Sequence, residues 1–228
     1  MIRKYFIVLI FFLATGSVYG QRFVYGQRFK FGILFDPTIT WLRSDVKDIT
    51  RDKARLGLDV GMAADYYFSQ NYALSTGITL FNTGGTLSYT KKHTLHTKDG
   101  NITFEEGEGG KVKYKVRYIK IPASLKFKTH MIGRIVYSAN LGFDPMIRVA
   151  TRADITSLDY NEKNVKLVDE TKLLNMGIHF GGGAQYSLGG DASLFGGFSF
   201  MNTFMDMTKQ THGRITSNNF ALRIGVMF

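Results

Sequence analysis

The sequence of 228 residues contains no cysteine, only 3 prolines and, after its first twenty residues, no apolar run long enough to cross a bilayer as a helix. The lack of cysteine excludes a disulfide scaffold, a thiolate metal site, a thiol nucleophile and a lipid-modified N-terminal cysteine. The chain does contain 25 glycines, 44% hydrophobic, 14% aromatic and 21% charged residues. This composition argues against disorder and favours an all-β fold whose strands approach one another closely.

The first twenty residues, 1–20, have the layout of a secretory signal peptide. Two basic residues precede the apolar run Tyr5–Ala14, which is shorter than the roughly 20 residues that a membrane-spanning helix needs. Small residues favour cleavage between Gly20 and Gln21, although a cut after Gly26 fits equally well because the hexapeptide VYGQRF occurs twice in succession. We therefore predict a signal peptide over 1–20 and one mature domain over 21–228. The alternative is an N-terminal membrane anchor.

The mature chain alternates between bulky apolar residues and small or polar ones with a period of two, which is typical of strands with two different faces. This pattern predicts strands at 28–42, 55–68, 72–84, 113–128, 134–147, 173–188, 193–204 and 217–228. The connections are short at 69–71, 129–133 and 189–192, and long and polar at 43–54, 85–112, 149–172 and 205–216. Short and long connections alternate strictly, as they do at the two ends of a transmembrane barrel.

The composition of the two faces indicates which side of each strand meets lipid. One face is bulky and apolar, while the other is mostly glycine, alanine, serine, asparagine and scattered charges. Side chains just fill the interior of an eight-stranded barrel, so the small face should lie inside. We therefore predict an all-β, eight-stranded antiparallel up-and-down transmembrane β-barrel, with a soluble sandwich or lipocalin-like barrel as the alternative. Girdles at the membrane surfaces are expected from Trp41, Tyr66, Tyr67, Phe68, Tyr72, Tyr118, Phe127, Phe143, Tyr186 and Phe228.

The last strand ends the chain on an aromatic residue, with apolar residues at every second position: Phe220, Leu222, Ile224, Val226 and Phe228. Such a strand resembles the assembly signal of bacterial outer-membrane barrels, because it offers an unpaired amphipathic edge to the assembly machinery before closure. Together with the signal peptide and the even strand number, it predicts an integral outer-membrane protein whose termini are both periplasmic.

Several ionisable residues fall on the small face of the predicted strands: Asp59, Asp65, Lys120, Lys126, Asp144, His179 and Arg223. Because buried charges must be paired, we predict that they form a lumenal polar network that plugs the barrel. A small passive pore remains an alternative. So does a membrane-embedded lipid or peptide hydrolase, in which His179 would pair with an Asp or with a Ser such as Ser199. No residue spacing supports a catalytic site, and we expect no enzyme activity.

Other candidate binding sites are weak. His93 and His96 have no third histidine or cysteine to complete a metal site, so we predict neither metal nor cofactor. Glycines 181–183 lie inside a strand with no helix after it, so they should make room for a bulky lumenal neighbour, or let the strand bend, rather than bind phosphate. The net charge of +11 belongs to a chain routed through secretion. We therefore expect anionic lipid headgroups or lipopolysaccharide as partners, and no nucleic acid.

The sequence resembles the PorT-like outer-membrane β-barrels of Bacteroidetes-type bacteria. The resemblance lies in Phe31-Gly32-Ile33 with Pro37 and Trp41-Leu42, in 71–77 (NYALSTG) with Gly84-Gly85 after it, in 118–127 (YIKIPASLKF) and in 185–190 (QYSLGG). It covers nearly the whole mature chain and implies an eight-stranded barrel. Lys120 departs from the family, which usually has an acidic residue there, so no charge pairing is carried over at this position.

The founding member of that family is an accessory factor of type IX secretion and gliding. The resemblance therefore implies a non-enzymatic accessory or scaffold factor in protein secretion or envelope assembly. Secretion-system components would be contacted through the four long loops or the periplasmic turns, and the barrel-assembly machinery through the C-terminal strand.

Overall fold

In the computed structural model, the described residues are 29–91, 93–97, 100–104, 110–157, 161–167, 170–209 and 213–228. Their regular elements are β1 (Phe29–Ser44), β2 (Ile49–Lys53), β3 (Arg55–Tyr67), β4 (Tyr72–Tyr89), β5 (His93–Thr97), β6 (Gly100–Phe104), β7 (Gly110–Lys120), β8 (Ala123–Lys128), β9 (Ile135–Thr156), β10 (Asn161–Lys166), β11 (Leu174–Gly189), β12 (Ala192–Thr203) and β13 (Ile215–Met227). A search of these residues for a helix that could span a membrane found none. The predicted signal peptide and its cleavage site lie outside the described residues.

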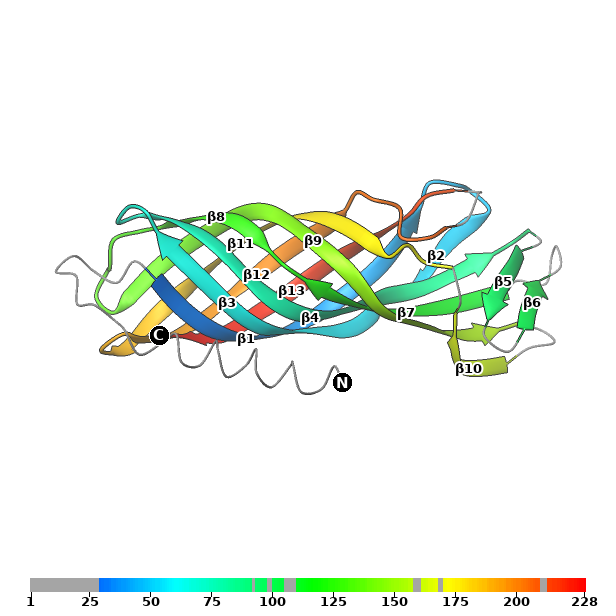
Figure 1. Ribbon diagram of the computed structural model, residues 1–228, viewed down its shortest axis with the longest axis horizontal. Helices are drawn as coiled ribbons and strands as arrows, with labels where there is room; N and C mark the ends of the chain where they lie inside the picture. Colours follow the sequence, from blue (N-terminus) through cyan, green and yellow to red (C-terminus); the bar gives the residue numbers. More distant parts are fainter. Residues whose placement is uncertain are drawn as a thin grey trace, which may run out of the picture.

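The strands close into a barrel (Figure 1). Antiparallel pairing runs from β1 to β3 to β4, then to β7 and β8, which follow one another along a single path, and on to β9. It continues through β11, β12 and β13, and β13 pairs with β1. Among the described residues this ring has eight positions, which confirms the predicted barrel.

The short and long connections lie at opposite ends of the barrel, as predicted. The short connections join β3 to β4, β8 to β9 and β11 to β12 at the turn end, where Phe31 and Phe228 exchange backbone hydrogen bonds of 2.8 and 2.7 Å. The other four connections lie at the loop end, and Figure 1 shows β5, β6 and β10 there, at the far end of the molecule from the C-terminus.

The long connections differ from the polar loops that the sequence predicted, because much of their length is strand. β4 continues to Tyr89, β7 begins at Gly110 and β9 continues to Thr156. β2 pairs with β4, and β10 with β9, while β5 and β6 form a small separate sheet. We call this region, made of 82–89, 110–117 and 150–156 with β2, β5, β6 and β10, the loop-end extension; the remaining ring is the barrel body.

The outer face of the barrel body is bulky and apolar. Leu74, Phe143 and Leu222 are 55%, 53% and 53% exposed, whereas the residues that alternate with them are small or polar and point inward. A continuous exposed belt of this kind is unfavourable in water and matches lipid. The bulky face therefore lies outside as predicted, and the alternative with this face inside is wrong.

Aromatic side chains form a girdle at the turn end, but Trp41 lies toward the loop end of β1, Phe143 lies midway along β9, and two further predicted members point inward. Ring centroids are 4.8 Å apart for Phe29 and Tyr66, and 5.6 Å apart for Tyr72 and Phe127. Tyr67 and Tyr118, in contrast, are 8% and 1% exposed and point into the interior. The prediction was wrong for both, because each has the inward parity of its strand, two residues from Asp65 and Lys120 respectively.

Candidate functional site

Two lysine–aspartate ion pairs cross the lumen of the barrel body. Lys126 Nζ lies 2.6 Å from Asp65 Oδ2, and Lys120 pairs in the same way with Asp59. All four side chains are largely buried, and they come from strands β3, β7 and β8. The Asp65 carboxylate also accepts a hydrogen bond from the Ser75 hydroxyl. The structure thus brings together four of the residues that the sequence placed inside the barrel.

Two further pairs complete the polar interior. His179 Nδ1 lies 2.9 Å from Asp144 Oδ2, and Arg223 Nε lies 3.2 Å from Asp36 Oδ2. Asp36 was not among the predicted residues, although its position between the outward residues Phe35 and Pro37 assigns it to the inward face. All seven predicted residues lie inside, and Asp36 is the missing partner of Arg223.

Asp36 also bridges an unpaired stretch between the first and last strands. β1 and β13 have no paired residues from Phe35 to Pro37, in a stretch where proline cannot donate to the ladder. The N–H of Ile224 donates to Asp36 Oδ1 instead, at 3.2 Å. A single carboxylate therefore joins the closing strands through both a side chain and a backbone group.

The remaining space inside the barrel body is small. A cavity of about 50 Å³ lies among Asp59, Lys120, Asp144 and His179, and another of about 30 Å³ lies near Phe195. Each has room for only a few water molecules. Gly183 lets the backbone of β12 approach closely and also makes room for Phe195, because a Cβ at that position would meet the Gly196 carbonyl oxygen and, at 2.9 Å, the Phe195 ring. This confirms that glycine in this stretch accommodates a bulky lumenal neighbour.

The cavity holds part of the arrangement that a hydrolase would need. Ser199 lines it together with the His179–Asp144 pair. Among the hydrogen bonds of the described residues, none joins the Ser199 hydroxyl to His179, and the cavity of about 50 Å³ does not admit a lipid or peptide. His179 is instead placed to hold the Asp144 carboxylate within the lumenal polar network.

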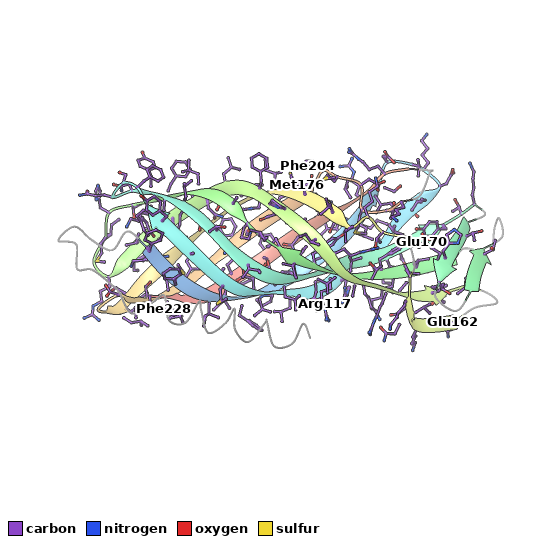
Figure 2. All side chains as sticks on the ribbon, viewed as in Figure 1. Arg117, Glu162, Glu170, Met176, Phe204 and Phe228 are labelled. Atoms are coloured by element: carbon purple, nitrogen blue, oxygen red, sulfur yellow. The ribbon has the colours of Figure 1, made fainter. Side chains whose placement is uncertain are left out.

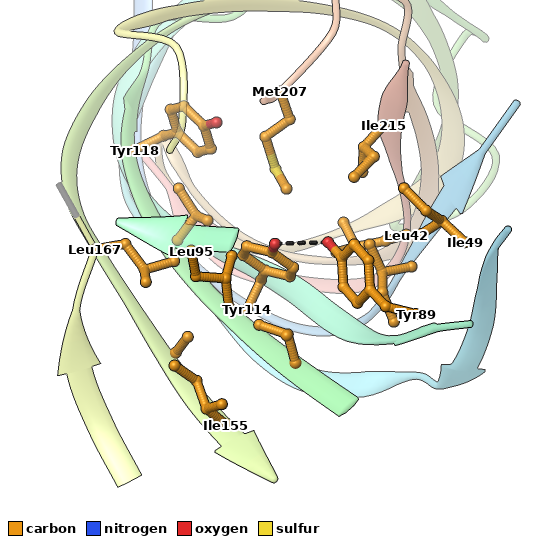
Figure 3. Close-up of a cluster of buried hydrophobic side chains, with 14 of the residues drawn as sticks. Leu42, Ile49, Tyr89, Leu95, Tyr114, Tyr118, Ile155, Leu167, Met207 and Ile215 are labelled. Carbon is orange, nitrogen blue, oxygen red and sulfur yellow. Dashed lines mark hydrogen bonds between the residues drawn. The ribbon is translucent and has the colours of Figure 1, made fainter. Parts of the chain in front are cut away.

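An apolar cluster fills the mouth of the barrel at the loop end (Figure 3). Each of the four long connections contributes a buried side chain to it: Ile49, Leu95, Leu167 and Met207. These pack with strand residues such as Tyr89 and Tyr114, whose hydroxyls are 2.7 Å apart. The sequence analysis missed this cluster, although apolar residues within otherwise polar connections were a signal for it.

The outer face of the loop-end extension is basic. Lys111, Lys113, Lys115 and Arg117 alternate on β7 with the inward residues Val112, Tyr114 and Val116. Lys115 Nζ lies 2.6 Å from Asp154 Oδ1. Burial opposes ionisation of Asp154, but the hydrogen bonds from Lys115 and from the Asn164 amide outweigh it and hold the pKa of Asp154 below its ordinary value.

The predicted assembly-signal residues lie on the outer face of β13. Phe220, Leu222, Ile224, Val226 and Phe228 are exposed, and β13 pairs with both β12 and β1. The strand edge that would be open before closure is therefore paired with β1 in the closed barrel, except opposite Phe35–Pro37.

The two loop histidines considered as metal ligands, His93 and His96, lie on β5. His96 is exposed and its backbone N–H donates to Glu170 Oε1 at 2.7 Å, while the His93 side chain lies outside the described residues. Among the described residues there is no group of three or more His, Asp or Glu side chains that could hold a metal ion.

Three solved structures illustrate what the chain is similar to. OprG from Pseudomonas aeruginosa has 10% identity and a TM-score of 0.50, covering 88% of this chain and 95% of that one. Neisserial surface protein A has 13% identity and a TM-score of 0.45, covering 86% and 95%. Ail of Yersinia pestis has 11% identity and a TM-score of 0.40, covering 89% and 100%. At these identities the similarity to OprG supports the fold alone.

A search of curated proteins found no match to the sequence. The family model of the outer membrane protein beta-barrel domain, however, matches residues 20–212, which is most of the chain. This match agrees with the closed antiparallel ring, the apolar outer face and the polar interior. The chain therefore belongs to the outer membrane protein beta-barrel domain family.

Proposed function

We propose that this protein is a non-enzymatic scaffold of the outer membrane whose loop-end extension contacts other envelope components. The observation that carries the proposal is the double plug of the interior. Ion pairs fill the barrel body, and an apolar cluster fills the mouth. A filled interior is expected of a rigid barrel rather than of a transport channel. The loop-end extension is therefore the part that we expect to contact partners.

The resemblance to PorT-like barrels supports a narrower version of this role, as an accessory factor in type IX-like protein secretion or envelope assembly. In this version both termini are periplasmic, as is the turn end, where β1 begins at Phe29 and the chain ends at Phe228, and the loop-end extension faces outward. The C-terminal strand would be the part that the barrel-assembly machinery recognises.

A deletion strain tests the scaffold role against the hydrolase alternative. Deletion should reduce secreted cargo, and the wild-type chain should restore it. The double variant H179N/S199A should restore it equally, since the Asn amide can still donate to Asp144 while the base and the candidate nucleophile are removed. Unchanged secretion on deletion would contradict the secretion role. Failure of a folded, inserted H179N/S199A protein would favour the hydrolase.

Planar-bilayer recording tests the pore alternative. The purified protein should show no discrete conductance steps, because the lumenal cavities formed by the described residues near Lys120 and Phe195 measure about 50 and 30 Å³. Regular single-channel steps from the wild-type protein would contradict the plugged interior.

The role of the C-terminal strand can be separated from its packing. Phe228→Ala should slow assembly in cells while leaving spontaneous folding into vesicles nearly unchanged. Phe204→Ala, an exposed aromatic residue outside that strand, is the control. Equal assembly of both variants in cells would contradict the proposed signal.

A further inference from the structure

A cleft of about 380 Å³ opens on the outside of the molecule where the loop-end extension leaves the barrel body. Four cationic side chains line it: Arg55, Lys115, Arg117 and Arg152. They come from β3, β7 and β9; β7 pairs with β9, and β4 lies between β3 and β7 in the ring. Figure 2 shows Arg117 on the outer side of the molecule, between the barrel body and the loop-end extension.

The charge of this cleft is largely uncompensated. Lys115 is paired with Asp154. Among the described residues, Arg55, Arg117 and Arg152 have no carboxylate within ion-pairing distance. Like charges held together without counter-charges are unfavourable, so an anion that enters the cleft would relieve their repulsion.

Neutral groups hold the arginines in place. Arg117 Nε donates to Asn82 Oδ1 at 3.1 Å, and Asn82 in turn donates to the carbonyl of Leu58 at 3.1 Å. Arg152 Nη1 donates to Asn164 Oδ1 at 3.3 Å. Amide oxygens orient a guanidinium without neutralising it, and a guanidinium presents paired donors that match a phosphate.

Arg55 contributes from the gap in which β3 leaves β4. Pairing of β3 with β4 ends at Asp59 and Phe81, and Arg55 Nη1 donates to the carbonyl of Thr83 at 2.8 Å beyond that point. This contact fixes the third arginine beside the other two, and it makes Arg55 part of the wall of the cleft.

The position of the cleft indicates what kind of anion it fits. Arg117 is paired with Asn82 and Ala150, and the next outward position on β7, Ile119, is paired with Leu80 and Ile147. Leu80 and Ile147 belong to the exposed apolar belt. Two residues along a strand span roughly 7 Å, so the arginines stand directly at the edge of the surface that acyl chains would cover.

We propose that this cleft binds the phosphorylated headgroup of a membrane lipid, with the phosphate on Arg117 and Arg152 and the acyl chains against the apolar belt at Leu80 and Ile147. This inference rests on the proposed membrane scaffold and adds a defined lipid site to it. Because the loop end faces outward in the proposed orientation, the lipid would be a phosphorylated glycolipid of the outer leaflet.

Native mass spectrometry of the full-length protein in detergent, titrated with lipid A, tests this site. The wild type should retain lipid A in preference to phosphatidylcholine. R117Q/R152Q should bind lipid A on the order of tenfold or more weakly, since charge-assisted hydrogen bonds to both guanidinium groups are lost. R117K/R152K should lie between the two, because lysine keeps the charge without the paired donors.

The matched control is R43Q/R134Q, which removes two exposed arginines that do not line the cleft, Arg43 on β1 and Arg134 at the turn end, and should bind as the wild type does. Equal binding by R117Q/R152Q and R43Q/R134Q would overturn the proposal. So would binding of inorganic pyrophosphate as tight as that of lipid A, which would indicate a site for a soluble anion. Heat-modifiable gel migration of each variant shows whether the barrel has folded, so a failure of the lipid site is distinguishable from a failure of the membrane scaffold.

Discussion

The barrel body and the loop-end extension share the strands β4, β7 and β9 but have opposite polarity. In the barrel body β9 points Leu141 and Phe143 outward and Asp144 inward, whereas in the extension it points Arg152 outward and Ile155 inward. β7 changes in the same way, because Lys115 points outward in the extension and Lys120 points inward in the barrel body. The comparison shows that a strand's period of two defines its faces, while the surrounding solvent decides which face must be apolar.

The largest expected effect comes from unpairing a charge inside the barrel body. Lys126→Met leaves Asp65 buried without its cation, and should lower the free energy of unfolding in lipid vesicles by about 3–5 kcal/mol. Lys115→Met removes the same group from the half-buried outer pair with Asp154, which is more accessible to solvent, and should cost at most about 1 kcal/mol. The double variant D65N/K126M should regain most of the stability. Equal costs for the two single variants would erase the contrast between the regions.

The second-largest expected effect comes from a charge placed on the outer face, which should hinder membrane insertion in the barrel body but not in the extension. Phe143→Lys lies midway along the lipid-facing part of β9 and should destabilise insertion by roughly 2–4 kcal/mol. Thr156→Lys is on the outer face of the same strand, within the extension, and should insert normally. The fraction of folded protein in vesicles, read from heat-modifiable migration, measures both. Normal insertion of Phe143→Lys would show that the belt does not face lipid.

Removing a methyl group should lower the free energy of unfolding more where side chains pack against one another than where they face lipid. Ile155→Val removes one methyl group from the buried interior of the extension and should cost about 0.5–1.5 kcal/mol. Ile147→Val, on the lipid-facing side of the same strand, leaves space that lipid can fill and should cost less. Urea unfolding of the two variants in vesicles compares them, and a larger cost for Ile147→Val would argue against a packed core in the extension.

The smallest expected effect is the pH dependence of the outer pair. Because the folded pKa of Asp154 is held below its ordinary value, its stabilising contribution is complete above the unfolded pKa of about 3.9 and is lost as the pH falls through the folded pKa. Asp154→Asn should remove this part of the acid dependence and change stability by no more than about 1 kcal/mol. If Asp154→Asn left the dependence of stability on acidic pH unchanged, the proposed contribution of Asp154 would be contradicted.

The barrel body could be predicted from the sequence because its alternation is simple. Residues such as Phe220, Leu222 and Ile224 repeat every second position, and the inward charges Asp65 and Lys126 fall on the opposite parity. The partner of each charge could not be predicted, because it depends on the register between strands that are far apart in sequence. Asp36 was overlooked for this reason, beside a proline that resembles a turn signal.

The extension was harder to predict because its polarity is reversed. The sequence analysis missed the strand residues 85–89, 110–112 and 150–156, which it assigned to polar connections. The strand predicted at 113–128 already included Lys113 and Lys115, which alternate with Tyr114 and Val116 as regularly as the residues of a membrane strand. The inward position of Tyr118 follows from this alternation. The cleft around Arg117 and Arg152 needs three strands in register, and no local pattern in the sequence reveals it.

The reversal of polarity along β9 can be measured directly, because the chain has no native cysteine to interfere with single-cysteine labelling. Spin labels at 141, 143 and 147 in bilayers should be relaxed by oxygen, and labels at 152 and 156 by a water-soluble nickel chelate. Labels at 153 and 155 should be shielded from both. Oxygen access at 153 and 155, or nickel access at 141 and 143, would contradict the account.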